Sequence, residues 1–548
     1  MSAQPGSLRH LGDFTTTRRV LKIAAFALPI GGLSAVVAWA LLRLIGLITN
    51  LVFYQRLGTA LVAPGEGHHS PVLILLAPVA GGLLIGLIAR FGSEKVRGHG
   101  IPEAIESILV SGSKVQPRVA VLKPLASAIA IGTGGPFGAE GPIILTGGAF
   151  GSLVAQFFHF SAAERKTLLV AGAAAGMAAT FNAPLASVLL AVELLLFEWR
   201  PRSFIPVVAA VVVASALRVP LLGGGAIFPA PPGPLHLDAA VYGLCVVSGI
   251  VAGLLALAAT TLVYASEEGF QRLPVHWMWW PAIGGLIVGL GGLIVPQALG
   301  VGYNVIEAEL NGSIALNLIV GILVVKTLIW SLSLGSGTSG GVLAPMLMIG
   351  GALGGLEAAV FPTVAPGFWA LIGLAGVLGG VMRSPLTGVF FAVELTHRYE
   401  ALLPLLIGAG TAFVVSVLVL RRSVLTEKIA RRGLHLSREY SVDPLEVLFV
   451  NEVMATEGDA AVVSAAGPRV HADDTLRHVA YVMAESGHTA LPVTDRHDPD
   501  VPVGTITLEQ LLKGRLRDLH EERHSERVLK PLDLIGLGGS EDASGASG

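Results

Sequence analysis

The chain has 548 residues, of which 53% are hydrophobic and 14% are charged, and its mean hydropathy is +0.72. Soluble globular domains carry about 25% charged residues, so this composition excludes an ordinary soluble protein. The formal net charge of −2 says nothing about partners, and the single cysteine, Cys245, excludes a disulfide framework and offers no metal cluster. We expect a protein embedded in the lipid bilayer, with no nucleic-acid partner and no metal site.

Long apolar blocks recur along the chain, and each has the roughly 20 helical residues that cross a bilayer. The first block begins too late and runs too long for a signal peptide, so we expect a retained helix. The pattern predicts an all-α polytopic membrane protein, with blocks at residues 21–53, 71–91, 203–222, 241–264, 281–299, 314–334 and 402–420.

Basic residues flank the first and last blocks. By the positive-inside tendency this predicts that both termini are cytoplasmic. The residues concerned are Arg18, Arg19 and Lys22 before the first block and Arg421, Arg422, Lys428, Arg431 and Arg432 after the last. Trp277, Trp279 and Trp280 are typical of an interfacial aromatic belt.

The membrane part repeats itself. Three pairs of segments follow one another in the same order at a separation of about 200 residues. They are GHGIPEAI from Gly98 and GVGYNVIE from Gly300, the stretches from Lys123 and Lys326, and FNAPLASVLLAVEL and MRSPLTGVFFAVEL. We infer a duplicated unit, with repeats at about 20–220 and 235–433. Repeated transporters bring broken helices together near the membrane midplane.

Three turns share one pattern of glycines, a proline and then an apolar helix: GHGIP, GAEGP and SGGVLAP. Proline suits the first helical turn, and glycine lets backbone N–H groups approach a ligand closely. The first N–H groups of a helix lack internal partners and carry partial positive charge. Several such helix starts predict a site for a small anion. Glu140, in the second turn, is an ionisable group inside an apolar region and therefore a functional candidate.

At these motifs the chain resembles the CLC family of chloride channels and chloride–proton antiporters, over about residues 18–433. GHGIP stands where the family has GSGIP, GAEGP where it has GREGP or GKEGP, and GGVLAP where it has GGIFAP. The resemblance implies two inverted repeats of broken, tilted helices and a homodimer that moves chloride or a similar anion. Glu140 matches the gating glutamate, which also lies on the proton path. The implied anion-binding residues are His99, Gly100, Ile101, Gly141, Val342, Leu343 and Leu425.

The chain departs from the family pattern at four positions. His99 replaces the serine of GSGIP, which leaves the preference among anions open. Leu343 replaces a phenylalanine and Leu425 stands where a pore tyrosine is expected. Leu194 replaces the inner acid that serves the proton path, while Glu193 is kept and corresponds to Glu394, which suggests a structural role such as capping. Exchange for protons and passive voltage-gated conduction therefore both stay open.

Composition changes near residue 435, and residues 445–535 are expected to form a cytoplasmic α/β domain similar to one CBS module. Asp473 or Asp474 could cap a helix with apolar residues at helical spacing (Leu476, Val479, Ala480 and Met483). CBS modules bind adenine nucleotides, but Gln510 stands where a ribose-binding aspartate is common. Residues 1–17 are expected to be a cytoplasmic segment and residues 536–548 a disordered tail.

Two other functions fit the sequence less well than anion transport does. Residues 335–341 satisfy both G-x-G-x-x-G and G-x-S-x-G, but no α/β unit precedes them and no acid and histidine partner Ser339, which disfavours an enzyme. A cation site would need more buried carboxylates than this chain offers. We expect no cofactor apart from the nucleotide considered above, and a prokaryotic plasma membrane as the location.

Overall fold

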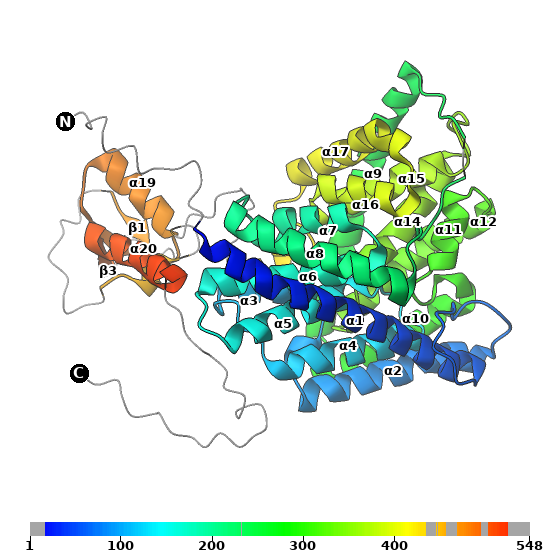
Figure 1. Cartoon of the computed structure of the whole chain (residues 1–548), viewed down its shortest axis with the longest axis horizontal. Coiled ribbons are helices and arrows are strands. Elements are labelled where there is room, and N and C mark those ends of the chain that lie inside the picture. The colour runs from blue at the N-terminus through cyan, green and yellow to red at the C-terminus, as the bar shows by residue number, and fades with distance from the viewer. Residues whose placement is uncertain are drawn as a thin grey trace.

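The computed structural model describes residues 17–231, 233–434, 445, 448–455, 468–494 and 502–523. The predictions for residues 1–16 and 536–548 lie outside these described residues. Within the described chain, seven helical segments are long and apolar enough to cross a bilayer, as the sequence predicts (Figure 1). They are α1 (Arg19–Tyr54), α2 (Pro71–Phe91), α8 (Pro201–Leu222), α9 (Ala239–Gln271), Trp277–Ile294 with α10 (Trp280–Ile294), Leu316–Gly335 with α12 (Leu316–Gly321) and α13 (Thr327–Gly335), and Tyr399–Val419 with α17 (Leu402–Val419).

Shorter helices fill the interior between these spans. Those that begin at the glycine-rich turns have 17 residues or fewer, which is too short for a full crossing and agrees with the predicted broken helices. The remaining helices of the membrane domain are α3 (Ile101–Leu109), α4 (Pro117–Gly132), α5 (Glu140–Gln156), α6 (Ala162–Phe181), α7 (Pro184–Leu190), α11 (Tyr303–Leu310), α14 (Leu343–Glu357), α15 (Phe368–Met382), α16 (Pro385–Thr396) and α18 (Thr426–Arg431).

The two repeats have the same backbone geometry as well as similar sequences. Left-handed backbone conformations recur in pairs about 200 residues apart, at Gly98 and Gly300, Gly100 and Gly302, Gly134 and Gly337, Asn182 and Arg383, and Phe197 and His397. Equivalent helices also pack in equivalent ways, since α5 lies on α6 as α14 lies on α15. Across the repeats, α2 packs on α10 and α7 packs on α16. Helices that pack on their own equivalents are what an approximate twofold relation between repeats produces.

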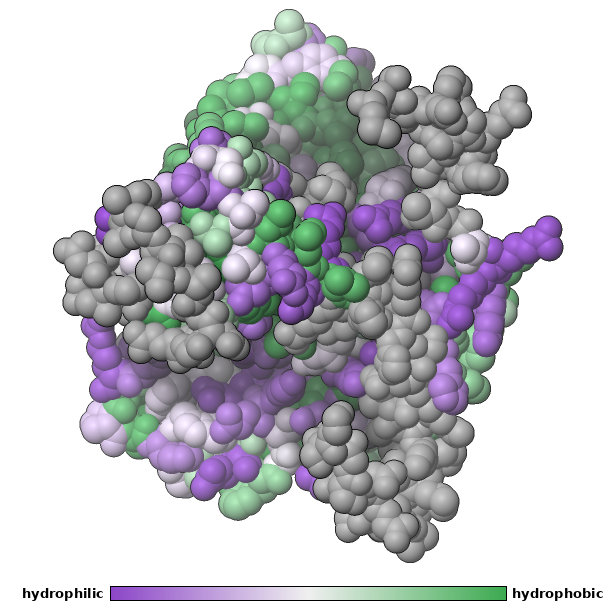
Figure 2. All heavy atoms as spheres, turned by 90° about the vertical axis from the view of Figure 1, so that its left-hand side faces the viewer, coloured by the Kyte–Doolittle hydropathy of each residue, from purple (hydrophilic) through white to green (hydrophobic). Residues whose placement is uncertain are grey.

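A small α/β domain follows the membrane domain. Its sheet has the order β1-β2-β3, with β1 parallel and β3 antiparallel to β2. Its elements are β1 (Val470–His471), α19 (Leu476–Ser486), β2 (Ala490–Thr494), β3 (Pro502–Thr507) and α20 (Leu508–Arg523). Helix α20 contacts α6, which ties this domain to one end of the helical bundle. Figure 2 looks at that end and shows hydrophilic residues gathered across it, with apolar residues on the body of the molecule behind.

The predicted helix of this domain is confirmed, but its predicted cap is wrong. Leu476, Val479 and Met483 are buried on one face of α19. The cap is Thr475, whose side chain accepts a hydrogen bond from the His478 N–H. Thr475 directly precedes the helix, whereas Asp474 is one residue too early and accepts a hydrogen bond from the His471 N–H at 2.7 Å.

Candidate functional site

Glu140 is the first residue of α5, and its side chain is fully buried. Its Oε1 accepts a hydrogen bond of 2.5 Å from the Ala344 N–H, in the first turn of α14. Oε2 has no hydrogen-bond partner among the described residues. The carboxylate of the first repeat therefore caps a helix of the second repeat, where a negative charge is favourable.

Glycines on both sides make room for this carboxylate. The Gly341 N–H donates to the Gly138 oxygen at 2.8 Å, which joins the two equivalent turns. A Cβ at Gly138 would lie 1.9 Å from Glu140 Oε2, and a Cβ at Gly341 would lie 2.8 Å from Glu140 Cδ. A side chain at Gly138 needs Glu140 to move, and one at Gly341 would also lie 2.6 Å from the Gly138 oxygen, so the two glycines form a close-fitting cradle around the carboxylate.

The start of α3 lies against the start of α5. A Cβ at Gly100 would meet the Gly141 oxygen at 2.7 Å, and a Cβ at Gly141 would meet the His99 oxygen at 1.9 Å. Gly100 has φ of +93°, a conformation that glycine adopts without strain. The structure thus brings together the sequence-predicted residues of both turns, with Ile101 following as the first residue of α3.

Two details near α3 were not predicted from the sequence. The Gly100 N–H, which belongs to a residue that the resemblance assigns to the anion, donates to Glu103 Oε2 at 3.0 Å. Glu103 lies three residues further along α3, where an acid can reach back to the cap. His99 is buried, and its Nδ1 has no hydrogen-bond partner among the described residues. His99 also lines a cavity of about 560 Å³ that opens at the level of α18 and the end of α9.

Two buried lysines hold the glycine turns. Lys123 Nζ donates to the Val96 oxygen at 2.9 Å and to the Gly98 oxygen at 2.5 Å. Lys326, its equivalent, donates to the Ala298 and Gly300 oxygens at 2.9 and 2.7 Å. In the sequence, both lysines mark the start of a repeated segment, and this recurrence is the signal that could have predicted their shared role.

The other predicted residues lie on two helices. Val342 and Leu343 form the cap and first residue of α14, beside Ala344. Leu425 is the cap residue of α18 and is fully buried. Lys428 of α18 forms an ion pair of 2.7 Å with Glu103, which links α18 to the start of α3.

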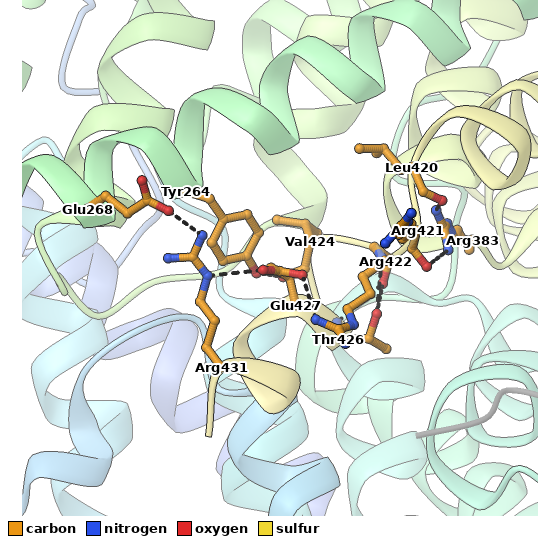
Figure 3. Close-up of polar contacts among 11 residues, drawn as sticks. Tyr264, Glu268, Arg383, Leu420, Arg421, Arg422, Val424, Thr426, Glu427 and Arg431 are labelled. Atoms are coloured by element: carbon orange, nitrogen blue, oxygen red, sulfur yellow. Dashed lines mark hydrogen bonds and ion pairs between the residues drawn. The ribbon is translucent and has the colours of Figure 1, made fainter. Parts of the chain in front are cut away.

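Helix α18 is held in place by contacts that the sequence did not predict (Figure 3). The Tyr264 hydroxyl of α9 donates to the Val424 oxygen, directly before Leu425. Arg431 bonds Glu268 at 2.7 Å and Glu427 at 3.1 Å. Arg383, at the end of α15, donates to the Leu420 oxygen at the end of α17. A tyrosine from α9 therefore lies next to the position where the expected pore tyrosine is missing, but its hydroxyl is bonded to backbone.

Glu193 and Glu394 cap one another's helices across the repeats. Glu193 accepts hydrogen bonds from the N–H groups of Leu386 and Thr387, at 3.3 and 2.8 Å, at the start of α16. Glu394 accepts from Leu185 and Ala186, at 2.9 and 2.8 Å, at the start of α7. This confirms the suggested capping role. Leu194 is fully buried.

Ser339 shows no catalytic arrangement. Its hydroxyl shares a hydrogen bond of 2.8 Å with the Ser127 hydroxyl, which joins α4 to the glycine turn that precedes α14. Within the described part of the chain, no group of three His, Cys, Asp or Glu side chains is placed to hold a metal ion.

The family model described as voltage gated chloride channel matches residues 81–417. The chain belongs to this family. The H(+)/Cl(−) exchange transporter ClcA of Salmonella arizonae is 34% identical over 416 residues, which cover 71% of this chain and 84% of that protein. The ClcA protein of Salmonella paratyphi A is 33% identical with the same coverage. A CBS family model matches residues 463–517, within the predicted C-terminal domain.

Solved structures of the family share this fold. A slow cyanobacterial Cl−/H+ antiporter superposes with a TM-score of 0.65 at 22% identity, over 76% of this chain and 99% of that one. A eukaryotic CLC transporter superposes with a TM-score of 0.64 at 20% identity, over 91% of this chain and 89% of that one. At these identities the likeness bears on the fold alone.

Proposed function

We propose that this voltage gated chloride channel family member exchanges chloride, or a similar small anion, for protons across the membrane. The observation that carries the proposal is the Glu140 carboxylate, which lies at the start of α14 with one oxygen bonded to the Ala344 N–H. A helix start that holds a carboxylate suits a halide in the same place. The curated relatives named above are H(+)/Cl(−) exchange transporters, which agrees with this proposal.

In the proposed mechanism, Glu140 and the anion compete for one site. The ionised carboxylate fills the cradle between Gly138 and Gly341 and blocks the anion. Protonation removes the negative charge and weakens the bond from the Ala344 N–H, so the side chain leaves and an anion takes its place. Acidification should therefore increase anion binding and flux.

Passive conduction remains the second candidate function, and one observation favours it. Leu194 occupies the position of the inner acid and is buried, while the neighbouring acid Glu193 is committed to the cap of α16. Glu140 is the proton-path residue that we propose. Exchange in this protein would therefore need a proton route from Glu140 that does not use position 194.

The remaining assignments follow from the same proposal. We place the protein in a prokaryotic plasma membrane as a homodimer, with both termini in the cytoplasm and His99, Gly100, Ile101, Gly141, Val342, Leu343 and Leu425 around the anion. Nucleotide binding by the CBS-like domain stays a prediction. Gln510 Oε1 accepts a hydrogen bond of 2.8 Å from the Thr507 N–H at the start of α20, so this side chain is used for capping.

The proposal is tested by recording anion efflux and external pH together in proteoliposomes that contain the wild type or Glu140→Gln. We expect a chloride gradient to drive uphill proton movement in the wild type. Glu140→Gln should abolish proton movement and leave anion flux intact. Chloride flux without proton movement in the wild type would establish the channel alternative, and absence of halide and nitrate flux in both proteins would contradict anion transport.

A further inference from the structure

We propose that Arg97 is an anion-binding station in the cavity that leads to His99, occupied before the anion reaches the Glu140 site. Arg97 and His99 line the same cavity of about 560 Å³ and are separated by one glycine. The assignment rests on the proposed function, because it gives the transported anion a first place to bind. It is a site of side-chain donors, in contrast to the backbone donors at α5 and α14.

Two tryptophans fix the Arg97 guanidinium. Its Cζ lies 4.7 Å from the ring centroid of Trp277, just before α10, and 5.5 Å from that of Trp280, the first residue of α10. Both distances are within the range of a cation–π contact. Trp279, between them, is 46% exposed and takes no part in this stack. The predicted aromatic belt thus includes two side chains that hold a cation at the cavity wall.

Glycine at two positions leaves space for positive groups beside the turns. Gly337 has φ of +82°, and a Cβ there would lie 2.8 Å from Arg97 Nε. Gly98 has φ of +81°, and a Cβ there would lie 2.3 Å from Lys428 Nζ. Both glycine turns that frame the cavity therefore contact a cationic side chain directly.

The cationic side chains that line the cavity differ in whether a carboxylate pairs with them. Lys428 pairs with Glu103, and Arg432 pairs with Glu106 and, at 3.6 Å, with Glu103. Among the described residues, Arg97 has neither an ion pair nor a hydrogen bond, and its buried Nε is without a partner. Lys95 also lines the cavity, but it is exposed to solvent. Glu94 and Glu267 also line the cavity but do not pair with Arg97.

This environment suits a small anion that must also leave. A guanidinium offers several N–H donors in one plane, and it is more weakly hydrated than an ammonium group. Its stack on two rings fixes those donors before an anion arrives, which reduces the ordering cost of binding. The neighbouring carboxylates keep the local field moderate, so that the anion is attracted without being trapped.

Transport provides the first test. The orientation of the protein in vesicles is determined by protease access to the C-terminal domain, and chloride is supplied from that side. We expect Arg97→Gln to raise the half-saturating chloride concentration about 3- to 10-fold, with a smaller change in maximal flux. Arg97→Lys should recover part of the loss, Trp277→Leu should cause a smaller rise, and exposed Arg90 provides the charge-matched control Arg90→Gln. Equal half-saturation in Arg97→Gln and the wild type would overturn the proposal.

Iodide quenching of tryptophan fluorescence tests the station without transport. In purified full-length protein at constant ionic strength, iodide held at Arg97 should quench Trp277 and Trp280 in a saturable way. Arg97→Gln should remove the saturable component, whereas Trp279→Phe should keep it. Acrylamide, a neutral quencher, should quench the wild type and Arg97→Gln to the same extent. Absence of a saturable component in the wild type would overturn the station, whatever the flux result. A saturable component without anion flux would support the station and contradict the proposed function.

Discussion

The first turn of α5 and the first turn of α14 occupy equivalent places in the two repeats, but only α5 begins with an acid. Glu140 corresponds to Leu343, Gly141 to Ala344 and Pro142 to Pro345. The two turns are bonded to one another through Gly138 and Gly341. The Glu140 carboxylate crosses from its own repeat to the amide of Ala344 in the other.

In the proposed mechanism, this difference gives the duplicated scaffold its gate. Two equivalent helix starts facing each other supply donors for one anion. Substitution of one apolar residue by a glutamate then supplies an internal anion for the same donors, and the paired glycines accommodate it. The shared contacts that hold the backbone should therefore control stability, and the positions that touch the Glu140 side chain should control transport.

The lysines shared by the repeats give the largest expected effect. Lys123→Met and Lys326→Met each leave two backbone oxygens without their charged donor, which should cost about 3 kcal/mol or more in the free energy of unfolding. Thermal unfolding in detergent would measure it, and Arg90→Met, at an exposed position, is the control. Similar decreases in the free energy of unfolding for both lysine variants would support the equivalence of the two repeats. Unchanged stability would show that the glycine turns do not depend on these lysines.

The paired glycines should act on the gate. Gly138→Ala pushes Glu140 from its cradle, so anion flux at neutral pH should rise toward its acidic value, by about 10-fold for a displacement cost of about 1.4 kcal/mol. Gly341→Ala should do the same and also lower stability, because its Cβ lies 2.6 Å from the Gly138 oxygen as well. Flux against pH is the measurement. Gly410→Ala is the control, since a Cβ there meets nothing within 4 Å. Wild-type pH dependence in both cradle variants would contradict this geometry.

The reciprocal caps should affect stability alone. Glu193→Ala and Glu394→Ala each remove a carboxylate from a helix start, which should cost about 1–2 kcal/mol in the free energy of unfolding. Proton-to-anion coupling should stay at the wild-type ratio, and exposed Glu307→Ala should change neither quantity. If Glu193→Ala removed coupling while stability held, Glu193 would be a proton-path residue.

The smallest expected effect comes from His99, which corresponds to Val301 in the second repeat. His99→Ser restores a hydroxyl donor at the cavity end, and we expect the chloride-to-nitrate flux ratio to change about 2- to 5-fold, the size of one neutral hydrogen bond. Flux ratios under matched gradients would measure it. Val301→His is the reciprocal variant. An equal change of the flux ratio in His99→Ser and Val301→His would show that position 99 does not by itself set the anion preference.

The sequence allowed the repeats, the broken helices and Glu140 to be predicted, because glycine, proline and an isolated acid are local signals. The contacts of Arg383 and Tyr264 with distant backbone could not be predicted, since they depend on how α9, α15 and α17 pack on one another. The resemblance assigns Gly100 to the anion, and the hydrogen bond from the Gly100 amide to Glu103 could not be predicted, because Glu103 reads as an ordinary helical residue in sequence. The backbone turns could be predicted from the sequence, whereas the choice of acceptor for each backbone N–H group could not.

The most direct test of the central claim is chloride binding measured by calorimetry at several pH values, in the wild type and in Glu140→Gln. If the carboxylate and the anion share one site, wild-type affinity should rise as pH falls, because protonated Glu140 releases the donors. The Glu140→Gln affinity should equal the acidic wild-type value at every pH. Wild-type affinity that does not change with pH, or a variant that follows the wild type, would contradict the account.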